Sequence, residues 1–272
     1  MIPAGSAGRT PDGEGPEISV ILPAYNEAPV IARSVTRVDS FLRDTGRSYE
    51  ILLGDDGSSD ATIPNALATG CAALRVIARE HGGKGAILTA SLADARGDYV
   101  GFIDADLEID IAYLTEFLGL LDGGADAVIA RKTDPLEAGR RRPLRRRVLT
   151  FLYNAAARTL FGTPYRDHQA GMKFFRRSLL QRILPSIRSH GWIWDTEVLV
   201  ASRRAGATVA EVPIVTLEVP GRIPKVSWLS TSLAMSRELL ILRSQVGRAP
   251  GAGSTPVDAQ GETAVAAGIR SR

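Results

Sequence analysis

Short apolar runs and amphipathic segments alternate through the first half of the chain. The apolar runs have the length of strands and are too continuous to leave one face in water. Helix-length segments separate most of them, which is typical of a mostly parallel sheet covered on both faces. We therefore predict an α/β fold. The predicted strands are 18–22, 49–53, 74–78, 99–103 and 127–130, and the predicted helices are 29–43, a segment after Asp60, 81–95 and 113–121.

The second half has longer helical patterns and fewer apolar runs. Gly162 is expected to end the first of these helices. The amphipathic pattern near the end places Trp228, Met235 and Leu239 on one stripe, which indicates packing against a core or an interface. The predicted elements are helices at 144–161, near 178–183, from about 191 and at 228–246, and a strand at 208–215 interrupted at Pro213. The polar and aromatic run 167–175 receives no element.

The two ends of the chain differ in composition from its middle. Residues 1–16 are rich in Gly, Pro, Ser and acidic residues, and residues 247–272 are rich in Gly, Ala, Ser and Pro. Such segments bury too little apolar surface to offset the entropy of ordering. We expect a disordered leader and a disordered tail around one domain, 17–246.

An acidic turn follows the predicted strand 99–103. Asp104 and Asp106 stand two residues apart, and Glu108 follows at the same spacing. Carboxylates this close repel one another, and a hard divalent cation between them would relieve that repulsion. Mg²⁺ usually takes one or two protein carboxylates together with substrate phosphates. The turn therefore predicts a metal and diphosphate site, and a solvated acidic loop that caps the next helix is the alternative.

Polar clusters also follow the other predicted strands, so they should converge on the carboxyl edge of the sheet. Tyr25 could stack on a nucleobase, or be a plain turn aromatic. Asn26, Glu27, Asp55 and Asp56 could accept hydrogen bonds from a base and ribose. Lys84, at a Gly-rich helix start, could meet a phosphate through its charge and through unpaired amide groups.

The net charge is only +3, but arginines are concentrated at 140–142 and 145–147. Such a block predicts an anionic partner, namely phosphate, nucleic acid or a membrane surface, with a solvated basic loop as the alternative. A phosphate acceptor would already be ionised at neutral pH and would need no strong general base. His81, His168 and His190 have no triad-like partners, which argues against hydrolase chemistry.

Three further features of the sequence indicate where in the cell the protein is expected. The single cysteine, Cys71, excludes an internal disulfide and fits a reducing, cytoplasmic setting. The N-terminus lacks the pattern of a signal peptide. No apolar run reaches the roughly 20 residues of a membrane span. We expect a cytoplasmic protein, soluble or peripheral at the cytoplasmic membrane face.

Together these motifs resemble the family-2 inverting glycosyltransferases. The resemblance rests on Pro23–Glu27, Asp55–Asp60, Gly83–Gly85 and Asp104–Asp106. Within that family, Gln169–Phe175 and Trp194–Glu197 resemble the dolichyl- or polyprenyl-phosphate sugar synthases. The resemblance implies a GT-A fold, Mg²⁺ or Mn²⁺, a GDP-mannose or UDP-glucose type of donor and a polyprenyl phosphate acceptor. It divides the domain into a nucleotide-sugar half, 17–132, and an acceptor half, 133–246.

The resemblance also implies roles for individual residues. The catalytic residues would be Asp104, Asp106, Asp195 and Glu197, and the last two would orient sugar hydroxyls or supply a base. Helix N-capping is an equal alternative for Asp195 and Glu197. The metal would be held by Asp106 and Glu108. The nucleotide sugar would contact Pro23, Ala24, Tyr25, Glu27, Asp55, Asp56, Lys84, Asp104, Ala105 and Asp106. The acceptor phosphate would contact Arg131, Arg146, Arg147, Lys173, Arg222 and Lys225.

Several positions depart from the family pattern. Glu108 stands where Gln or Gly is usual, and Met172 stands where Phe is usual. Gly221–Lys225 is one residue longer than the family's Gly-x-Ser-Lys, so the acceptor contact there stays open. Two other functions also stay open: a soluble transferase with a small hydroxylated acceptor, and a non-catalytic basic module that binds nucleic acid. The last leaves the acidic turn unexplained, so we expect no nucleic-acid partner. The sequence leaves open a membrane partner subunit.

Overall fold

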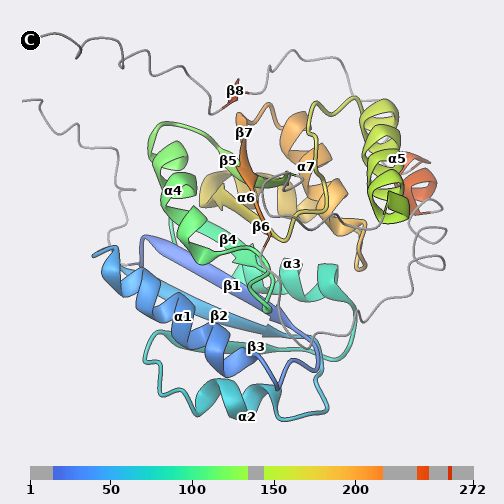
Figure 1. Ribbon diagram of the computed structural model, residues 1–272. Helices are drawn as coiled ribbons and strands as arrows, with labels where there is room; N and C mark the ends of the chain where they lie inside the picture. Colours follow the sequence, from blue (N-terminus) through green and yellow to red (C-terminus); the bar gives the residue numbers. More distant parts are fainter. Residues whose placement is uncertain (1–14, 134–143, 217–237, 245–256, 259–272) are drawn as a thin grey trace, which may run out of the picture.

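A computed structural model describes residues 15–133, 144–216, 238–244 and 257–258, with side chains in the second of these ranges from Val148 onward. It contains one eight-stranded sheet in the order β3-β2-β1-β4-β6-β5-β7-β8 (Figure 1). Neighbouring strands run parallel except on both sides of β6, which is antiparallel to β4 and to β5. The strands are β1 (Ile18–Ala24), β2 (Tyr49–Asp55), β3 (Leu74–Ala78), β4 (Tyr99–Ile103), β5 (Ala127–Lys132), β6 (Met172–Arg176), β7 (Val209–Ile214) and β8 (Val257–Asp258).

The helices lie where the periodicity predicts them, within a few residues at each end. In α1, Val35, Val38 and Leu42 are buried at the spacing of one helix face. Gly162, with φ +66°, ends α5 by donating its amide to the Arg158 carbonyl. The helices are α1 (Ile31–Asp44), α2 (Thr62–Leu67), α3 (Lys84–Asp94), α4 (Leu114–Asp122), α5 (Leu144–Phe161), α6 (Arg177–Ile183) and α7 (Trp194–Arg204), with short 3₁₀ turns at Ile111–Tyr113 and Leu184–Ser186.

The sheet separates two apolar cores, because successive side chains of a strand point to opposite faces. In β1, Val20 packs into the core under α1 and α4, whereas Ile21 packs into the core under α3, α6 and α7. Phe102 and Phe174, from adjacent strands, divide between the two cores in the same way. A third cluster joins α5, α7 and the helical segment 238–244. The predicted mostly parallel α/β fold is confirmed.

Two strands differ from the sequence prediction. The run 167–175, left without an element, contains β6, which joins the first four strands to β5 and β7. Strand β7 is not interrupted at Pro213, because the strand continues through that residue in register with Arg131 of β5.

Other predictions fall partly or wholly outside the described residues. Val257 and Asp258 pair with β7, and the rest of the expected tail, 247–272, lies outside the described residues. The leader up to residue 14, the arginines 140–142 and the segment 217–237 lie outside the described residues. Within the described part of the chain, no helix combines the length and apolarity that a membrane crossing needs.

Gly101 explains how β6 fits against β4. A Cβ atom at this position would lie 2.3 Å from Cγ of Phe174, whereas one at Gly119 in α4 would meet nothing within 4 Å. We therefore expect Gly101→Ala to lower the free energy of unfolding by about 1–3 kcal/mol, the usual cost of overpacking. The control Gly119→Ala should raise it by about 0.5–1 kcal/mol. Urea unfolding of both variants checks this, and equal stabilities would contradict the close packing of β6.

Candidate active site

The polar clusters converge at the carboxyl edge of the sheet, as the strand order requires. Strand β1 lies between β2 and β4 and is parallel to both, so the loops after these three strands meet. The chain reverses its direction of strand addition at β1, and such a switch point is where ligands bind in open α/β sheets. Pro23 and Ala24, predicted to contact the nucleotide sugar, are the last residues of β1.

The loops after β1 and β2 hold each other in place. Asn26 has φ +53°, which an Asn tolerates, and its amide donates to the Ser58 hydroxyl at 2.9 Å. Its side-chain oxygen accepts from the Ser59 amide at 2.9 Å. The Glu27 amide donates to Thr62 Oγ1 at 2.8 Å. These contacts fix the turn that carries Tyr25 and Glu27.

Tyr25 is 41% exposed and stacks on His81, with ring centroids 4.2 Å apart and planes 23° apart. His81 Nδ1 lies 2.8 Å from Asp56 Oδ2, and that carboxylate also accepts from the amides of Gly82 and Gly83. The structure thus brings Tyr25 and Asp56 together, and adds His81, for which sequence reasoning assigned no role.

Asp55, the last residue of β2, is almost fully buried. Its Oδ2 accepts from the Ser58 amide at 2.9 Å, whereas its Oδ1 is buried without a hydrogen-bond partner among the described residues. A buried carboxylate oxygen without a partner is costly. It is therefore a candidate acceptor for an N–H or hydroxyl group of a ligand.

Lysines neutralise the acidic turn after β4. The Lys84 ammonium donates to Asp104 Oδ1 at 2.7 Å, and Lys132 donates to Glu108 Oε2 at 3.3 Å. Asp106 is nearly buried, and its Oδ1 accepts from the Glu108 amide at 3.0 Å. Sequence reasoning missed Lys132, although its place as the last residue of β5 puts it at this edge.

The backbone of the turn is strained and anchored. Leu107 has φ +51°, a left-handed conformation that costs a non-glycine residue about 1–2 kcal/mol. Its side chain is buried in the core under α1 and α4, which holds the turn in place. The Ala105 carbonyl accepts from the Ser34 hydroxyl at 2.6 Å. Strain that the surrounding packing maintains is common at functional sites.

Carboxylates of this turn fit a hard divalent cation in their chemistry. Among the residues that the structure describes, no group of three or more His, Cys, Asp or Glu side chains is arranged to hold a metal. Mg²⁺ and Mn²⁺ accept one or two protein carboxylates and complete their shells with water and phosphate oxygens. Asp106 fits such a site, and Glu108 would join it by leaving Lys132.

The start of α3 differs from the prediction. Its first amides are not open to a phosphate, because the carbonyl of His190 accepts from Gly85 at 2.7 Å and from Ala86 at 3.1 Å. A Cβ atom at Gly85 would lie 2.8 Å from that carbonyl oxygen, so the glycine permits the close approach. Of the predicted phosphate contacts at this helix, the Lys84 ammonium is the one that the geometry supports.

Gly171 lies directly against the acidic turn. Its carbonyl accepts from the Asp104 amide at 2.9 Å, and a Cβ atom on Gly171 would lie 1.9 Å from Asp104 Oδ2. Asp104 is also held electrostatically: burial would raise the pKa of its carboxyl, but the nearby Lys84 outweighs burial and lowers it. The segment before β6 thus determines where Asp104 lies.

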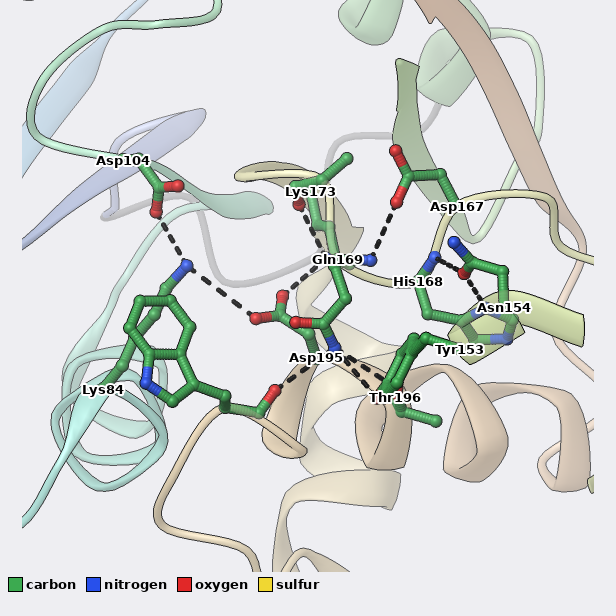
Figure 2. A network of polar contacts seen from close by, with 12 residues as sticks. Lys84, Asp104, Tyr153, Asn154, Asp167, His168, Gln169, Lys173, Asp195 and Thr196 are labelled. Atoms are coloured by element: carbon green, nitrogen blue, oxygen red, sulfur yellow. Dashed lines mark hydrogen bonds and ion pairs between the residues drawn. The ribbon is translucent and has the colours of Figure 1, made fainter. Parts of the chain in front are cut away.

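Lys173 lies in the interior of the protein. Its side chain is fully buried, and its ammonium donates to Asp195 Oδ1 at 2.5 Å and to the Ala170 carbonyl at 2.7 Å (Figure 2). The acceptor-phosphate contact of Lys173 stays a prediction, and in this structure its ammonium is bound by protein groups. Asp195 Oδ2 lies 3.7 Å from Lys84 Nζ, so both oxygens of Asp195 face ammonium groups rather than a substrate.

Glu197 is also committed to the protein itself. It is buried, and its two carboxylate oxygens accept from the amides of Arg188 and Ser189 at 3.0 and 2.7 Å. These contacts anchor the 188–193 loop, which carries the His190 carbonyl that caps α3. Both oxygens of Glu197 serve to hold this loop, and its role as a base or sugar contact stays a prediction.

A polar network behind these carboxylates joins α5 to the 167–169 turn and to α7 (Figure 2). The Tyr153 hydroxyl lies 2.6 Å from Thr196 Oγ1 and accepts from the Gln169 side chain at 3.0 Å. His168 is buried between Asn154 and Thr163, at 2.9 and 2.8 Å. Sequence reasoning missed this network, since its members are neutral residues scattered along the chain.

The acceptor side is described only in part. Arg131 is the next-to-last residue of β5, and its Nε is buried without a hydrogen-bond partner among the described residues. Arg146 and Arg147 belong to the first turn of α5, but their side chains lie outside the described residues, as do Arg222 and Lys225 altogether. Besides Lys173, Arg131 is thus the predicted acceptor contact for which the structure gives a position.

Comparison with protein-family models matches residues 19–184 to Glycosyl transferase family 2. The chain belongs to this family. The predicted enzyme class, a glycosyltransferase, is confirmed with it.

Glycosyltransferase AglD of Haloferax volcanii is 34% identical over 208 residues, which cover 74% of this chain and 33% of that protein. The chain thus spans a third of that relative's length. Dolichyl-phosphate beta-glucosyltransferase of Saccharomyces cerevisiae is 28% identical over 257 residues, 85% of this chain and 75% of that protein.

Solved structures of a sugar-phosphate synthase share the fold. Glucosyl-3-phosphoglycerate synthase from Mycobacterium tuberculosis, solved with Mn²⁺, UDP and phosphoglyceric acid, superposes with a TM-score of 0.63 at 27% identity, covering 88% of this chain and 81% of that chain. The same enzyme with UDP gives a TM-score of 0.64 at 28% identity, covering 88% of this chain and 83% of that chain. The predicted GT-A type of fold is thereby confirmed.

Gly171→Ala tests whether the acceptor half positions Asp104. The added methyl group must displace the Asp104 carboxylate, so we expect glycosyl transfer to fall by roughly 100-fold, as for ångström-scale misplacement of reacting groups. The melting temperature should change little, because the clash falls on a partly exposed side chain. Turnover and thermal melting check this, with Gly119→Ala as the control. Wild-type turnover would contradict the role assigned to this contact.

His168 predicts a pH dependence of stability. Burial, with smaller effects of Lys173 and Arg158, lowers the pKa of its imidazole to about 3 from the usual 6.5. Between those values the unfolded chain binds a proton that the folded chain does not, so stability falls as pH falls from about 6.5 to about 3. The slope is about 1.4 kcal/mol per pH unit. Urea unfolding of His168→Gln should show a smaller slope, and an unchanged slope would contradict the buried neutral state.

Proposed function

We propose that this protein transfers a hexose from a nucleotide sugar to a polyprenyl phosphate, with inversion of the anomeric carbon. The observation that carries this proposal is that both candidate bases, Asp195 and Glu197, are bound by other groups of the protein. Asp195 lies between two lysines, and Glu197 binds two backbone amides. A hydroxyl acceptor needs a base to remove its proton, whereas a phosphate acceptor is already ionised at neutral pH.

The donor that we favour is UDP-glucose. Curated relatives from yeast, Dictyostelium and Drosophila are dolichyl-phosphate beta-glucosyltransferases. The unpartnered Oδ1 of Asp55 could accept an N–H group of the base, and Tyr25 with His81 offers an aromatic surface beside it. GDP-mannose is the competing donor.

The acceptor phosphate would approach from the end of β5 and the start of α5. Arg131 carries the buried Nε without a described partner, and guanidinium groups bind phosphate well. After its arginines, α5 exposes Val148, Phe151 and Leu152, with exposed fractions of 46%, 64% and 55%. A helix with basic and apolar residues side by side suits the surface of an anionic membrane. We therefore place the protein, in this proposal, at the cytoplasmic membrane face.

The reaction would be a single displacement. An acceptor phosphate oxygen attacks the anomeric carbon while the bond from that carbon to the nucleoside diphosphate breaks. The Lys84 ammonium would offset charge on the leaving diphosphate. Mg²⁺ or Mn²⁺ held by Asp106 and Glu108 would supply further charge compensation when bound. Asp104, fixed by Gly171 and Lys84, would contact the donor.

A second candidate is transfer to a small phosphorylated acceptor. It is favoured by the superposition on glucosyl-3-phosphoglycerate synthase solved with phosphoglyceric acid. In that case a hydroxyl group is the nucleophile, and Asp195 would have to leave Lys173 to serve as its base.

Thermal melting with sugar nucleotides tests the donor site. UDP-glucose with Mn²⁺, at about 100 times its dissociation constant, should raise the melting temperature by roughly 5–10 °C. GDP-mannose and UDP-GlcNAc are the comparison donors, each with and without Mg²⁺ or Mn²⁺. Asp106→Ala should remove the metal-dependent part of the shift and lower turnover about 100-fold. If none of these donors raises the melting temperature, the transferase proposal is contradicted.

Transfer assays with two acceptors separate the candidate functions. Radiolabelled glucose should move to polyprenyl phosphate in vesicles, and 3-phosphoglycerate should remain unglucosylated. Product formed only on 3-phosphoglycerate would instead favour the second candidate.

A further inference from the structure

Four alternating charges run from the interior of the acceptor half to the acidic turn (Figure 2). The sequence is Lys173, Asp195, Lys84 and Asp104, with successive N–O distances of 2.5, 3.7 and 2.7 Å. The side chain of Lys173 is 0% exposed and that of Asp195 is 2% exposed, whereas Lys84 is 14% exposed and Asp104 is 38% exposed. The chain of charges therefore leads from the core to the surface of the proposed donor site.

Stability alone does not account for the inner pair. Taking Lys173 and Asp195 out of water costs several kcal/mol per ion, and well-packed apolar residues of similar volume often replace such pairs without loss. Lys173 could have been a methionine in this core, since it packs over the Phe102 ring with its ammonium 5.4 Å from the centroid. The pair also contacts Lys84 through Asp195, so its role can lie in how it affects the Lys84 side chain.

Lys84 depends on its surroundings for its charge. Its ammonium lies over the rings of Phe102 and Trp192, 5.1 and 5.6 Å from their centroids. Burial would lower its pKa, but the carboxylates of Asp104 and Asp195 outweigh burial and raise it. Asp195 also lies between the two ammonium groups, which would otherwise repel each other across the Phe102 ring.

We propose that Lys173 and Asp195 are positioning residues that hold the Lys84 ammonium at the acidic turn to meet the donor diphosphate. Lys173 fixes Asp195 through Oδ1, and Asp195 draws Lys84 to the turn through Oδ2. When a diphosphate arrives, Asp104 is the partner that Lys84 can exchange, because Asp104 is the more exposed of its two carboxylates. This inference rests on the proposed function, since it assigns the phosphate contact of that same donor site.

The test removes both inner charges together, so that no buried charge is left unpaired. Lys173→Met with Asp195→Asn should melt within a few degrees of the wild type and bind UDP-glucose with Mn²⁺ about tenfold more weakly by calorimetry. Lys84→Met should weaken binding by at least as much. The triple variant should bind no more weakly than Lys84→Met alone, because the pair acts through Lys84. Wild-type affinity of the pair variant, or losses that multiply in the triple variant, would overturn the proposal.

A matched control lies at the opposite edge of the sheet. Glu50 and Arg75 form an ion pair at 2.6 Å, in which Glu50 is 8% exposed, near the amino ends of β2 and β3. Glu50→Gln with Arg75→Met removes a partly buried ion pair far from the acidic turn and should leave the affinity for UDP-glucose unchanged. If the first pair variant does not fold, Lys173→Met with Asp195→Leu replaces it, since an apolar pair avoids an unsatisfied buried amide.

A second readout separates this proposal from the function on which it rests. Without Asp195 the pKa of Lys84 should fall, so its amine should react several-fold faster with an acetylating reagent at pH 8, measured by mass spectrometry. The faster acetylation of Lys84 is expected even when no donor is present. If the wild type binds no sugar nucleotide but labelling rises in the pair variant, the proposed function fails and the positioning role stands. Unchanged labelling overturns the positioning role.

Discussion

The antiparallel strand β6 between β4 and β5 is the constraint on which the site depends. It brings Gly171 against Asp104 and places Lys173 opposite Phe102, so the acceptor half reaches the acidic turn from the interior of the sheet. The close packing that Gly101 permits is thus a condition for the geometry of the charged groups above it.

Charge compensation at the acidic turn comes from two lysines on different elements, and a third lysine lies behind them. Lys84 begins α3, Lys132 ends β5 and Lys173 lies within β6. Lys84 pairs with Asp104 and Lys132 with Glu108, whereas Lys173 pairs with Asp195, whose other oxygen lies 3.7 Å from Lys84. The acidic residues of this turn therefore do not stand alone, because the lysines beside them balance part of their charge.

The sequence predicts the elements well where periodicity is strong. The bounds of β3, β4 and α5 follow directly from apolar runs and from Gly162, and the convergence of Tyr25, Asp55, Lys84 and Asp104 follows from the rule for parallel strands. Strand β6 is missed because Lys173 and Arg176 interrupt its apolar pattern, and a buried lysine reads as exposed. Its partner Asp195 is 22 residues away in sequence, so only the folded chain shows the pair. The contact of the His190 carbonyl with α3 could not be predicted from the sequence, because every residue has a backbone carbonyl.

The cap on α3 restricts how the two halves of the molecule can move. The His190 carbonyl, from the second half of the chain, accepts hydrogen bonds from the Gly85 and Ala86 amides at the start of α3 in the first half. A hinge motion that separated α3 from the 188–193 loop would break these bonds and leave the end of the helix unsatisfied. We therefore expect α3 and this loop to move together as one unit.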